Sequence, residues 1–595
     1  MNKPPLSQVQ MMFQDALARH QQGDIAQAQA IYREILRIEP QHAASMHLLG
    51  VTCFQTGQPS VAVNLISEAI RLNPDYAEAY SNRGIVLHDL KRYEESLKSY
   101  DEAIRLRPAY AEAFYNRGIV LHDLKRYEES LKSYDEAIRL KPTYAEAYSN
   151  RGIVLHDLKR YEESVKSYDD AIRINPSYAE AHSNRGYVLR DLKRYEESLK
   201  SCDDAIRLNP AYAEAHSNRG NALHGLKRYE ESLKSYDEAI RLNPGYVKVY
   251  YNRGVVFHDL RRYEESVKSY DEAIRRNPTY VDAHWNKSVL NLLFGYYDMG
   301  WAGYEWRFNV EMLSNKKRDY AQPLWSGKES LDGKKILIYA EQGLGDTIQF
   351  CRYAMLLREA GATVFLDVPG TLVSLMRTLD AGVIIVESGD LPPEFDYHCP
   401  LLSLPGACGT TLETIPHARQ YLHADAEKVR YWNERLGLKL KPRIGLAWSG
   451  NIEHIKDHLR SIALKDLLEH LPDHAEYLCL QKEIRESDRD EWSEQLKILH
   501  TADDLHDFSD TAALIECLDL VVCVDTSVAH LAGALGKPTW VLLPCVPDWR
   551  WLLDRDDSPW YPSVKLYRQD EGREWPAVLE RVKSDIAQFR FVAGG

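Results

Sequence analysis

Residues 77–108 read AEAYSNRGIVLHDLKRYEESLKSYDEAIRLRP, and residues 111–142 repeat them almost letter for letter, 34 positions further on. Each copy predicts one helix over AEAYSNRGIVLHDL, a turn at KRY, and a second helix over EESLKSYDEAIRL that ends before a proline. The step continues along the chain, with proline at positions 40, 74, 108, 142, 176, 210, 244 and 278. One copy cannot bury the apolar stripe of its second helix alone, so neighbouring copies must stack. The first half of the chain is therefore predicted to be an α-solenoid with a concave inner face.

A period of 34 residues is that of the tetratricopeptide repeat. One polar position of the first helix is asparagine in seven successive copies, and an amide offers one acceptor and two donors to the main chain of an extended peptide. Copying of nearly identical units explains this row equally well. Over about residues 43–290 the array resembles the superhelix of eukaryotic protein O-GlcNAc transferase, in which an inner asparagine ladder grips acceptor polypeptide. The resemblance implies a peptide groove at Asn82, Asn116, Asn150, Asn184, Asn218, Asn252 and Asn286.

The 34-residue pattern stops before Trp325, where short β-rich runs begin to alternate with amphipathic helices. This alternation predicts a doubly wound α/β region with two Rossmann-like lobes and a cleft between them. We expect strands at 335–339, 363–368, 383–386, 443–448, 477–480, 520–524 and 540–543, and helices at 346–359, 372–379, 462–471, 511–518, 527–535 and 576–589. The predicted domains are a degenerate repeat or cap at 1–40, the array at 41–310, a linker at 311–333, a first lobe at 334–438 and a second lobe at 439–595.

Composition excludes several classes of function. The net charge is -14, and acidic and basic residues are interleaved, so there is no basic stripe for a nucleic acid. No apolar run is long enough for a signal peptide or a membrane span. The nine cysteines are scattered without metal-ligand spacing, which fits a reducing cytoplasm. We therefore expect a cytoplasmic protein without bound metal or transmembrane segment.

The segment VVCVDTSVAHLAGALGKP, residues 521–538, predicts a buried strand that ends at Asp525 and a helix that begins at once. Free backbone N–H groups and the helix dipole make such a junction a natural diphosphate site, to which Thr526, Ser527 and His530 could add donors. Ordinary helix capping is the alternative explanation.

The segment AEQGLGDTIQF, residues 340–350, follows the first predicted strand of the α/β region. Gly343 and Gly345 allow a tight turn, and Asp346 opens the next helix. A carboxylate facing the cleft could take a proton from an attacking acceptor hydroxyl, which is the task of a general base. Again the alternative is that Asp346 only caps its helix.

The loop WSGNIEHIKDHLRSI, residues 448–462, follows the first strand of the second lobe. Arg460 or Lys456 could neutralise a leaving nucleoside diphosphate, although the loop could equally be a solvated surface. Trp549 and Trp551 could wall a sugar site, whereas the acidic run at 554–557 is expected to be a solvated turn. The remaining cleft candidates are Gln349, His398, Asn451, Lys482 and Trp549.

Together these segments resemble the heptosyltransferase-like glycosyltransferases (family nine) of GT-B fold, over about residues 334–589. The resemblance implies a nucleotide-sugar co-substrate with no other cofactor and no metal. It also implies that Asp346 is the base and that Asp525, Thr526, Ser527 and His530 surround the donor diphosphate. Two departures leave the sugar open: Gln349 replaces the family's first-loop histidine, and Arg460 is the nearest substitute for its lysine-tryptophan signature.

The whole arrangement looks like a bacterial family of repeat-plus-glycosyltransferase proteins. The leading hypothesis is a glycosyltransferase that acts with inversion on a polypeptide held by the repeats. One alternative is an enzyme that extends glycan or lipopolysaccharide and uses its repeats to dock partner proteins. Another is an adaptor whose α/β region binds nucleotide-sugar without turnover. The sequence leaves the sugar, nucleotide, acceptor and oligomeric state open.

Overall fold

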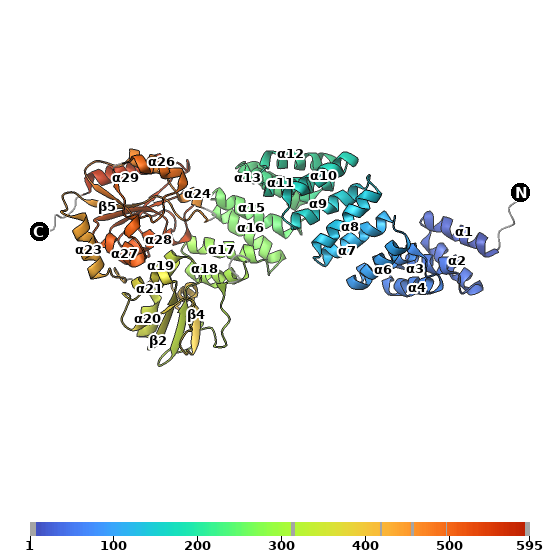
Figure 1. The fold of residues 1–595 in the computed structure, drawn as a ribbon, viewed down its shortest axis with the longest axis horizontal. Coiled ribbons are helices and arrows are strands. Elements are labelled where there is room, and N and C mark those ends of the chain that lie inside the picture. Colours follow the sequence, from blue (N-terminus) through green and yellow to red (C-terminus); the bar gives the residue numbers. More distant parts are fainter. Residues whose placement is uncertain (1–7, 311–315, 417–418, 454–456, 496, 590–595) are drawn as a thin grey trace. The chain divides into compact units, whose positions relative to one another are not determined.

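The computed structural model describes residues 8–310, 316–416, 419–453, 457–495 and 497–589 (Figure 1). The chain divides into two compact units, residues 1–256 and 257–595. The first unit is helical, and the second joins three further helices to two parallel sheets. The predicted order, an α-solenoid followed by a two-lobed α/β region of GT-B type, is confirmed.

Pairs of antiparallel helices build the first unit. Each helix A ends in a turn whose second residue has left-handed backbone, for example Lys91 with a φ of 57°. There the Arg92 N–H donates to the Leu87 carbonyl at 2.8 Å and closes the helix. The helices are α1 (Gln8–Gln21), α2 (Ile25–Ile38), α3 (Ala43–Gln55), α4 (Pro59–Leu72), α5 (Ala77–Asp89), α6 (Tyr93–Leu106), α7 (Ala111–Asp123), α8 (Tyr127–Leu140), α9 (Ala145–Asp157), α10 (Tyr161–Ile174), α11 (Ala179–Asp191), α12 (Tyr195–Leu208), α13 (Ala213–Gly225), α14 (Tyr229–Leu242) and α15 (Val247–Asp259), the last of which spans the division.

The glycine of helix A is a point of close helix contact, as its periodic position predicts. A Cβ atom on Gly118 would lie 2.7 Å from the Tyr134 ring of the following helix B. The Ser130 hydroxyl also donates to the Gly118 carbonyl at 2.7 Å. Glycine is required here because any side chain would displace a buried tyrosine.

The last helices of the array belong to the second unit. They are α16 (Tyr263–Arg276), α17 (Val281–Leu293) and α18 (Tyr297–Tyr304), followed by the 3₁₀ helix η1 (Glu305–Asn309). The Trp301 indole donates to the Thr410 carbonyl at 3.1 Å, and the Trp560 indole donates to the Tyr297 hydroxyl at 3.2 Å. Packing therefore divides the chain inside the predicted array, not at its end.

The first lobe has a four-stranded parallel sheet in the order β3-β2-β1-β4. One helix predicted over 346–359 is in fact two, because the chain turns at Cys351 and Arg352, where the Arg352 Nε donates to the Gln349 carbonyl at 2.8 Å. The elements are β1 (Lys335–Tyr339), α19 (Leu344–Phe350), α20 (Tyr353–Glu359), β2 (Thr363–Val368), α21 (Gly370–Met376), β3 (Val383–Glu387), β4 (Tyr397–Pro400), η3 (Leu401–Ser403) and α22 (Leu404–Ala407).

The second lobe has a six-stranded parallel sheet in the order β10-β9-β8-β5-β6-β7. The strands β7 and β10 and the helices α23 and α26 were not predicted. The elements are α23 (Ala426–Leu436), β5 (Arg443–Ala447), α24 (Asp457–Arg460), α25 (Leu464–Glu469), β6 (Glu476–Cys479), η4 (Glu486–Asp488), α26 (Arg489–Glu494), β7 (Ile498–Leu499), η5 (Ala502–Asp504), α27 (Phe508–Glu516), β8 (Leu520–Val524), α28 (Ser527–Ala534), β9 (Thr539–Leu543), η6 (Trp549–Trp551), β10 (Val564–Arg568) and α29 (Pro576–Gln588).

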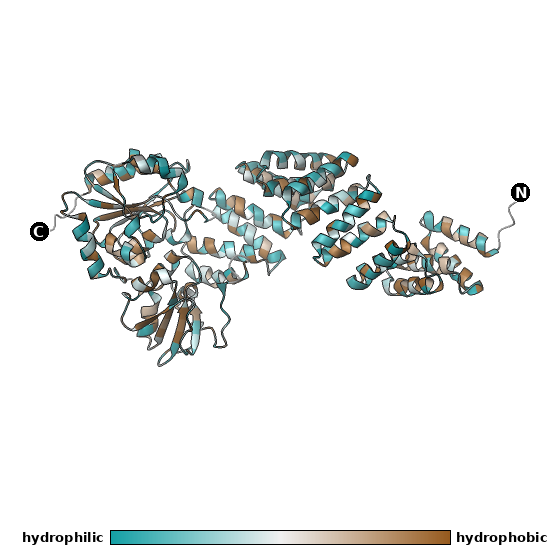
Figure 2. Cartoon of the chain, in the orientation of Figure 1, coloured by the Kyte–Doolittle hydropathy of each residue, from teal (hydrophilic) through white to brown (hydrophobic). Residues whose placement is uncertain are grey.

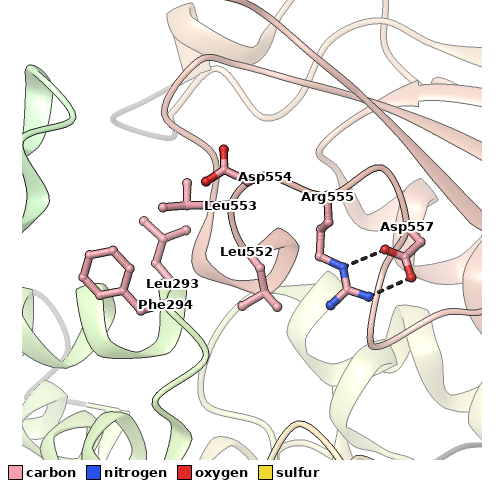
Figure 3. A pocket seen from close by; sticks show the side chains of 7 residues that line it. All are labelled: Leu293, Phe294, Leu552, Leu553, Asp554, Arg555 and Asp557. Atoms are coloured by element: carbon pink, nitrogen blue, oxygen red, sulfur yellow. Dashed lines mark hydrogen bonds and ion pairs between the residues drawn. The ribbon is translucent and has the colours of Figure 1, made fainter.

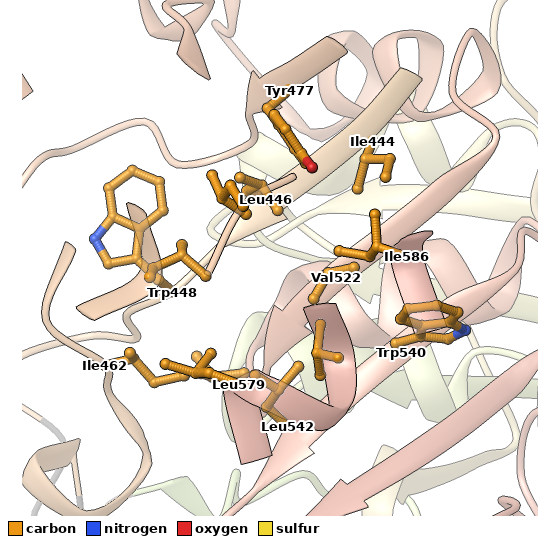
Figure 4. Packing of buried hydrophobic residues seen from close by; sticks show 14 of the residues in the cluster. Ile444, Leu446, Trp448, Ile462, Tyr477, Val522, Trp540, Leu542, Leu579 and Ile586 are labelled. Atoms are coloured by element: carbon orange, nitrogen blue, oxygen red, sulfur yellow. The ribbon is translucent and has the colours of Figure 1, made fainter. Parts of the chain in front are cut away.

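The core of the second lobe lies between its sheet and the flanking helices (Figure 4). Ile444, Val522 and Leu542 come from three adjacent strands, and Leu579 and Ile586 come from α29. Figure 2 shows the strands of both sheets as mainly hydrophobic ribbons. Strands buried on both faces read as continuous apolar runs, which is why β5, β8 and β9 were predictable.

Two segments near the predicted boundaries pack as parts of the lobes. In the predicted linker, of which residues 311–315 lie outside the described residues, Arg318 makes a bidentate pair with the buried Asp367 at 2.6 and 2.9 Å. Trp325 N donates to the His398 carbonyl of β4 at 2.9 Å. Helix α23, assigned by its position to the first lobe, packs on α27 of the second, where Lys428 Nζ lies 2.7 Å from Asp510.

Candidate functional site

The two lobes meet where α19 packs against α28 (Figure 1). A Cβ atom on Gly345 would lie 2.8 Å from His530 Cδ2 and 3.4 Å from the Ser527 Cα. Gly345 is therefore required for close approach between the two segments. The glycine-aspartate loop of the first lobe and the strand-to-helix junction of the second thus lie in one place.

Arg550 lies at the centre of this meeting point. It belongs to η6, which follows β9, and its side chain is only 9% exposed. Its Nε donates to Gln349 Oε1 at 2.7 Å, and its Nη1 donates to Asp548 Oδ1 at 2.8 Å. Its Nη2 pairs with Asp346 Oδ1. One guanidinium from the second lobe therefore binds two side chains of the first, and we call Arg550 with its three partners the Arg550 cluster.

Asp346 is both a helix cap and an ion-pair partner. Its Oδ2 accepts a hydrogen bond from Gly343 N at 2.8 Å, in a capping arrangement at the start of α19. Its Oδ1 pairs with Arg550. The capping alternative is thus realised in the structure, and the same carboxylate also faces the second lobe.

Asp525 follows β8 at the carboxyl edge of the six-stranded sheet. Burial and the nearby Asp548 carboxylate raise the pKa of Asp525 to about 6. Arg460, at the end of α24, donates to the Asp525 carbonyl at 2.7 Å, and its Nε is buried without a hydrogen-bond partner. The predicted phosphate candidates Asp525 and Arg460 therefore lie together.

The start of α28 holds a polar group that the protein leaves unsatisfied. Thr526 is the N-cap residue, yet its hydroxyl makes no capping bond and is buried without a partner. A buried hydroxyl without a hydrogen bond costs about 1–3 kcal/mol. Thr526 Oγ1 is thus a polar group at the helix start with hydrogen-bonding capacity to spare. Arg460 Nε lies 3.6 Å from Asp457 Oδ1 and makes no hydrogen bond.

His530 is buried inside α28. Its Nδ1 lies 3.0 Å from the Tyr561 hydroxyl, and its ring stacks on Trp551 with centroids 5.6 Å apart. Burial, and then the positive charge of Arg550, lower the pKa of His530 to about 3. The imidazole is therefore neutral at physiological pH.

We expect His530 to make the second unit less stable in mild acid. The unfolded chain takes up a proton below pH about 6.5, whereas the folded imidazole resists it, so its contribution is lost as the pH falls from about 6.5 toward 3. From pH 7 to pH 5 the difference in free energy of unfolding between wild type and His530→Asn should shrink by about 2 kcal/mol. Urea unfolding followed by tryptophan fluorescence measures this. The exposed His423→Asn is the control, and parallel pH curves for wild type and His530→Asn would contradict the expectation.

The prediction that Trp549 and Trp551 form the wall of a sugar site is wrong. Trp549 is 3% exposed and Trp551 is fully buried. Trp549 packs edge-on against Trp301 of α18, and the Arg550 guanidinium lies over its ring at 4.3 Å. Trp549 is covered by α18, and Trp551 packs against His530 and Tyr561 of its own lobe, so neither presents a face to a sugar.

His398 lies in β4 within an aromatic group of the first lobe. Its ring is 5.1 Å from Tyr320 and 6.1 Å from Tyr339. Burial lowers its pKa, and its buried Nδ1 has no hydrogen-bond partner. None of its recorded contacts is with the Arg550 cluster.

Two further candidates are surface residues. Asn451 is exposed, and its side-chain oxygen accepts from Glu453 N at 2.9 Å in a local turn. Lys482 is exposed and donates to the His506 carbonyl at 3.3 Å. Neither has a recorded contact with the Arg550 cluster, and Lys456 lies outside the described residues.

The asparagine row bonds partly to its own array. Asn150 Nδ2 donates to the Tyr115 hydroxyl at 3.0 Å, and Asn218 Nδ2 lies 3.1 Å from the Ser183 hydroxyl, each in the preceding repeat. Asn82 and Asn252 bond to His47 and Asn221 in a similar way, at 2.9 and 3.0 Å. All seven asparagines are half-buried. These hydrogen bonds link neighbouring repeats. An amide has one acceptor and two donors, so each of these side chains can make further hydrogen bonds.

An open pocket of about 480 Å³ lies where the chain leaves η6 (Figure 3). Arg555 and Asp557 on its rim form an ion pair at 2.7 Å. No residue predicted for the site lines this pocket. The lining residues are Leu293, Phe294, Leu552, Leu553, Asp554, Arg555 and Asp557.

Within the described residues, no group of three or more His, Cys, Asp or Glu side chains is arranged to hold a metal ion. A search of the same part of the chain finds no helix with the length and apolar character needed to cross a membrane. Sequence reasoning missed Arg550 and Asp548. Both lie in the segment PDWRW, whose two tryptophans prove to be buried, and the sequence alone does not show that burial.

Comparison with known families agrees with this architecture. Tetratricopeptide repeat models match residues 19–84, 86–125, 120–159, 154–189, 186–227, 213–246 and 247–280. Glycosyltransferase family 9 (heptosyltransferase) matches residues 504–542, which include α27, β8 and α28.

Individual proteins are similar to parts of this chain. Protein FlbA of Caulobacter vibrioides is 26% identical over 327 residues, 50% of this chain and 54% of FlbA, so the chain spans about half the length of this curated relative. Among solved structures, YrrB, a TPR protein with an unusual peptide-binding site, is 25% identical with a TM-score of 0.27 and covers 32% of this chain and 98% of its own. PilF of Pseudomonas aeruginosa is 22% identical with a TM-score of 0.32 and covers 35% and 94%. The chain thus joins an array of tetratricopeptide repeats to a GT-B-type α/β region in which residues 504–542 match glycosyltransferase family 9 (heptosyltransferase).

Proposed function

We propose that the second unit transfers a sugar from a nucleotide-sugar donor to an acceptor hydroxyl, with inversion and without a metal ion in the step. The observation that carries this proposal is the contact of α19 with α28, where a glycine-aspartate loop meets the family 9 segment. A carboxylate from one lobe and a helix start from the other are the two parts that such a displacement requires.

In the proposed reaction Asp346 accepts the proton of the acceptor hydroxyl. The acceptor oxygen forms a bond to the anomeric carbon while the bond from that carbon to the diphosphate oxygen breaks, and the nucleoside diphosphate leaves with the electron pair. The start of α28 and the Arg460 guanidinium stabilise the negative charge on the departing group. Thr526 supplies a hydrogen bond, and its unsatisfied hydroxyl is the structural support for this role.

The acceptor in this proposal is a polypeptide bound by the repeats. The half-buried asparagines support it, because their remaining donors and acceptors suit main-chain groups of an extended segment. An acceptor on a glycan or lipid would leave the repeats to dock partner proteins, and a panel of peptide and glycan acceptors distinguishes the two.

Thermal stabilisation by nucleotides tests the donor site directly. At about 100 times its dissociation constant a ligand stabilises the folded protein by about 2.7 kcal/mol. We expect one class of nucleoside diphosphate and its sugar to raise the melting temperature of wild type, and Thr526→Val with Arg460→Met to lose most of this shift. Lys482→Met, which changes an exposed lysine outside the cluster, is the matched control. No shift with any nucleotide would contradict the donor site, and binding without transfer to any acceptor would favour a non-catalytic adaptor.

A further inference from the structure

Arg550 is a buried cation that the proposed reaction has not yet used. Its recorded hydrogen bonds reach Asp346 and Gln349 in the first lobe and Asp548 in its own lobe. Its guanidinium lies over the Trp549 ring, and its ring neighbours include Phe350 at 5.7 Å. Trp549 and Phe350 pack against the guanidinium and restrict its position. Its N–H groups therefore point toward its carboxylate and amide partners in the Arg550 cluster.

The pairing bears directly on Asp346. One carboxylate oxygen is engaged by Gly343 N and the other by Arg550. A carboxylate takes a proton through an oxygen lone pair, and here a backbone amide and a guanidinium compete for those lone pairs. In this state Asp346 is oriented toward the second lobe but is a hindered proton acceptor.

Arg550 also interacts electrostatically with groups near the start of α28. Burial, and then the positive charge of Arg550, lower the pKa of His530. Burial and Asp548 raise the pKa of Asp525, and the charges of Arg460 and then Arg550 oppose that rise. Asp525 precedes the helix start at which the donor diphosphate is proposed to bind, and His530 is the fourth residue of the helix. A diphosphate there would attract the guanidinium more strongly than a single carboxylate does, because it carries more charge and offers several acceptor oxygens.

We propose that Arg550 is a positioning residue that couples the donor site to the base: it holds Asp346 in the empty site and releases it when a diphosphate binds at α28. The inference rests on the proposed function, because it requires a donor diphosphate at that place. It also predicts the order of events, since the acceptor hydroxyl meets an available base only after the donor has bound. Premature attack by water would be suppressed by the same contact.

Carbodiimide labelling of Asp346 with glycine ethyl ester tests this coupling without any sugar transfer. Trypsin releases residues 336–352 as one peptide that contains Glu341 and Asp346, and the buried Glu341 serves as an internal control. We expect wild-type Asp346 to react slowly, and about tenfold faster when pyrophosphate or the stabilising nucleoside diphosphate is bound. Arg550→Met should react fast with or without diphosphate, and Arg550→Lys, which keeps the charge, should restore slow labelling and part of the response.

Each result decides between the two proposals. If a diphosphate stabilises the protein but Asp346 labelling does not change, the coupling is wrong and the donor site stands. If no diphosphate binds, the proposed function fails and donor-driven release fails with it. Equal labelling rates of Asp346 in wild type and Arg550→Met would show that Arg550 does not restrain Asp346. Should Arg550→Met not fold, as judged by tryptophan fluorescence, Arg550→Gln gives the same contrast with a polar side chain.

Discussion

Replacing Asp346 with Asn is expected to abolish sugar transfer while nucleotide binding persists. The amide keeps the size of the side chain and can still accept the hydrogen bond from Gly343 N, but it cannot take a proton from an acceptor hydroxyl. Loss of a general base lowers kcat by about 10²–10⁴-fold. The measurement is transfer from the donor that stabilises wild type, together with thermal stabilisation of the variant by its nucleoside diphosphate.

A matched change nearby separates chemistry from packing. Asp557→Asn alters another ion-paired aspartate, bound to Arg555 on the loop after η6, and should leave kcat close to the wild-type value. If Asp346→Asn turns over at the wild-type rate, Asp346 is not the base. If it also loses nucleotide binding, the effect is on the site as a whole and the general-base role loses its support.

The repeats were predictable because their information is local. The 34-residue step, the proline after each helix B and the glycine of helix A place α5 to α14 within a residue or two of their observed ends. The sequence did not show at which helix the repeats begin to pack as part of the second unit. Tyr297 and Trp301 look like ordinary repeat residues, and only their contacts with Trp560 and Thr410 assign α18 to the second unit.

In the second lobe the predictability of a strand followed its burial. Strands β5, β8 and β9 are buried along their whole length and were placed closely, whereas the edge strand β10 contains the exposed Lys565 and the half-buried Arg568 and was missed. The two-residue strand β7 has no pattern of its own. Helix α23 was missed as well, although Asp425 caps it with two side-chain bonds to backbone amides at 2.8 and 3.1 Å.

The candidate site was predicted in part. The strand-to-helix junctions located Asp346, Asp525 and Thr526, because loops after parallel strands converge at one sheet edge. Arg550 was not predicted, because the neighbouring Trp549 and Trp551 were interpreted as an exposed aromatic wall. Side-chain burial is a tertiary property, and the repeat helices that cover Trp549 are more than 200 residues away in the sequence.

Arg307→Met is expected to destabilise the second unit by about 3–5 kcal/mol, because it leaves the buried Glu341 carboxylate without its cation. Arg307 is fully buried in η1, and its Nη2 lies 3.0 Å from Glu341 Oε1 and 2.7 Å from the Ser403 hydroxyl. Glu341 also accepts from the amides of Leu401 and Leu402 at 3.1 and 3.3 Å. The end of the array and the first lobe are thus joined by a buried ion pair rather than by a free linker.

Tryptophan fluorescence during urea unfolding measures this loss selectively, because all twelve tryptophans lie at or beyond position 285 and therefore in the second unit. Burial raises the pKa of Glu341 to about 7, against the opposing charge of Arg307. A carboxyl whose pKa is raised in the folded state makes the protein less stable as the pH rises. The loss in free energy of unfolding caused by Arg307→Met should therefore be larger at pH 8 than at pH 6. Arg307→Met with Glu341→Gln removes both charges and should recover part of the loss, since the glutamine oxygen can still accept from one of the two amides. Additive effects of the two changes would show that the pair is not coupled, and the junction between repeats and lobe would then depend on its other contacts, such as those of α18.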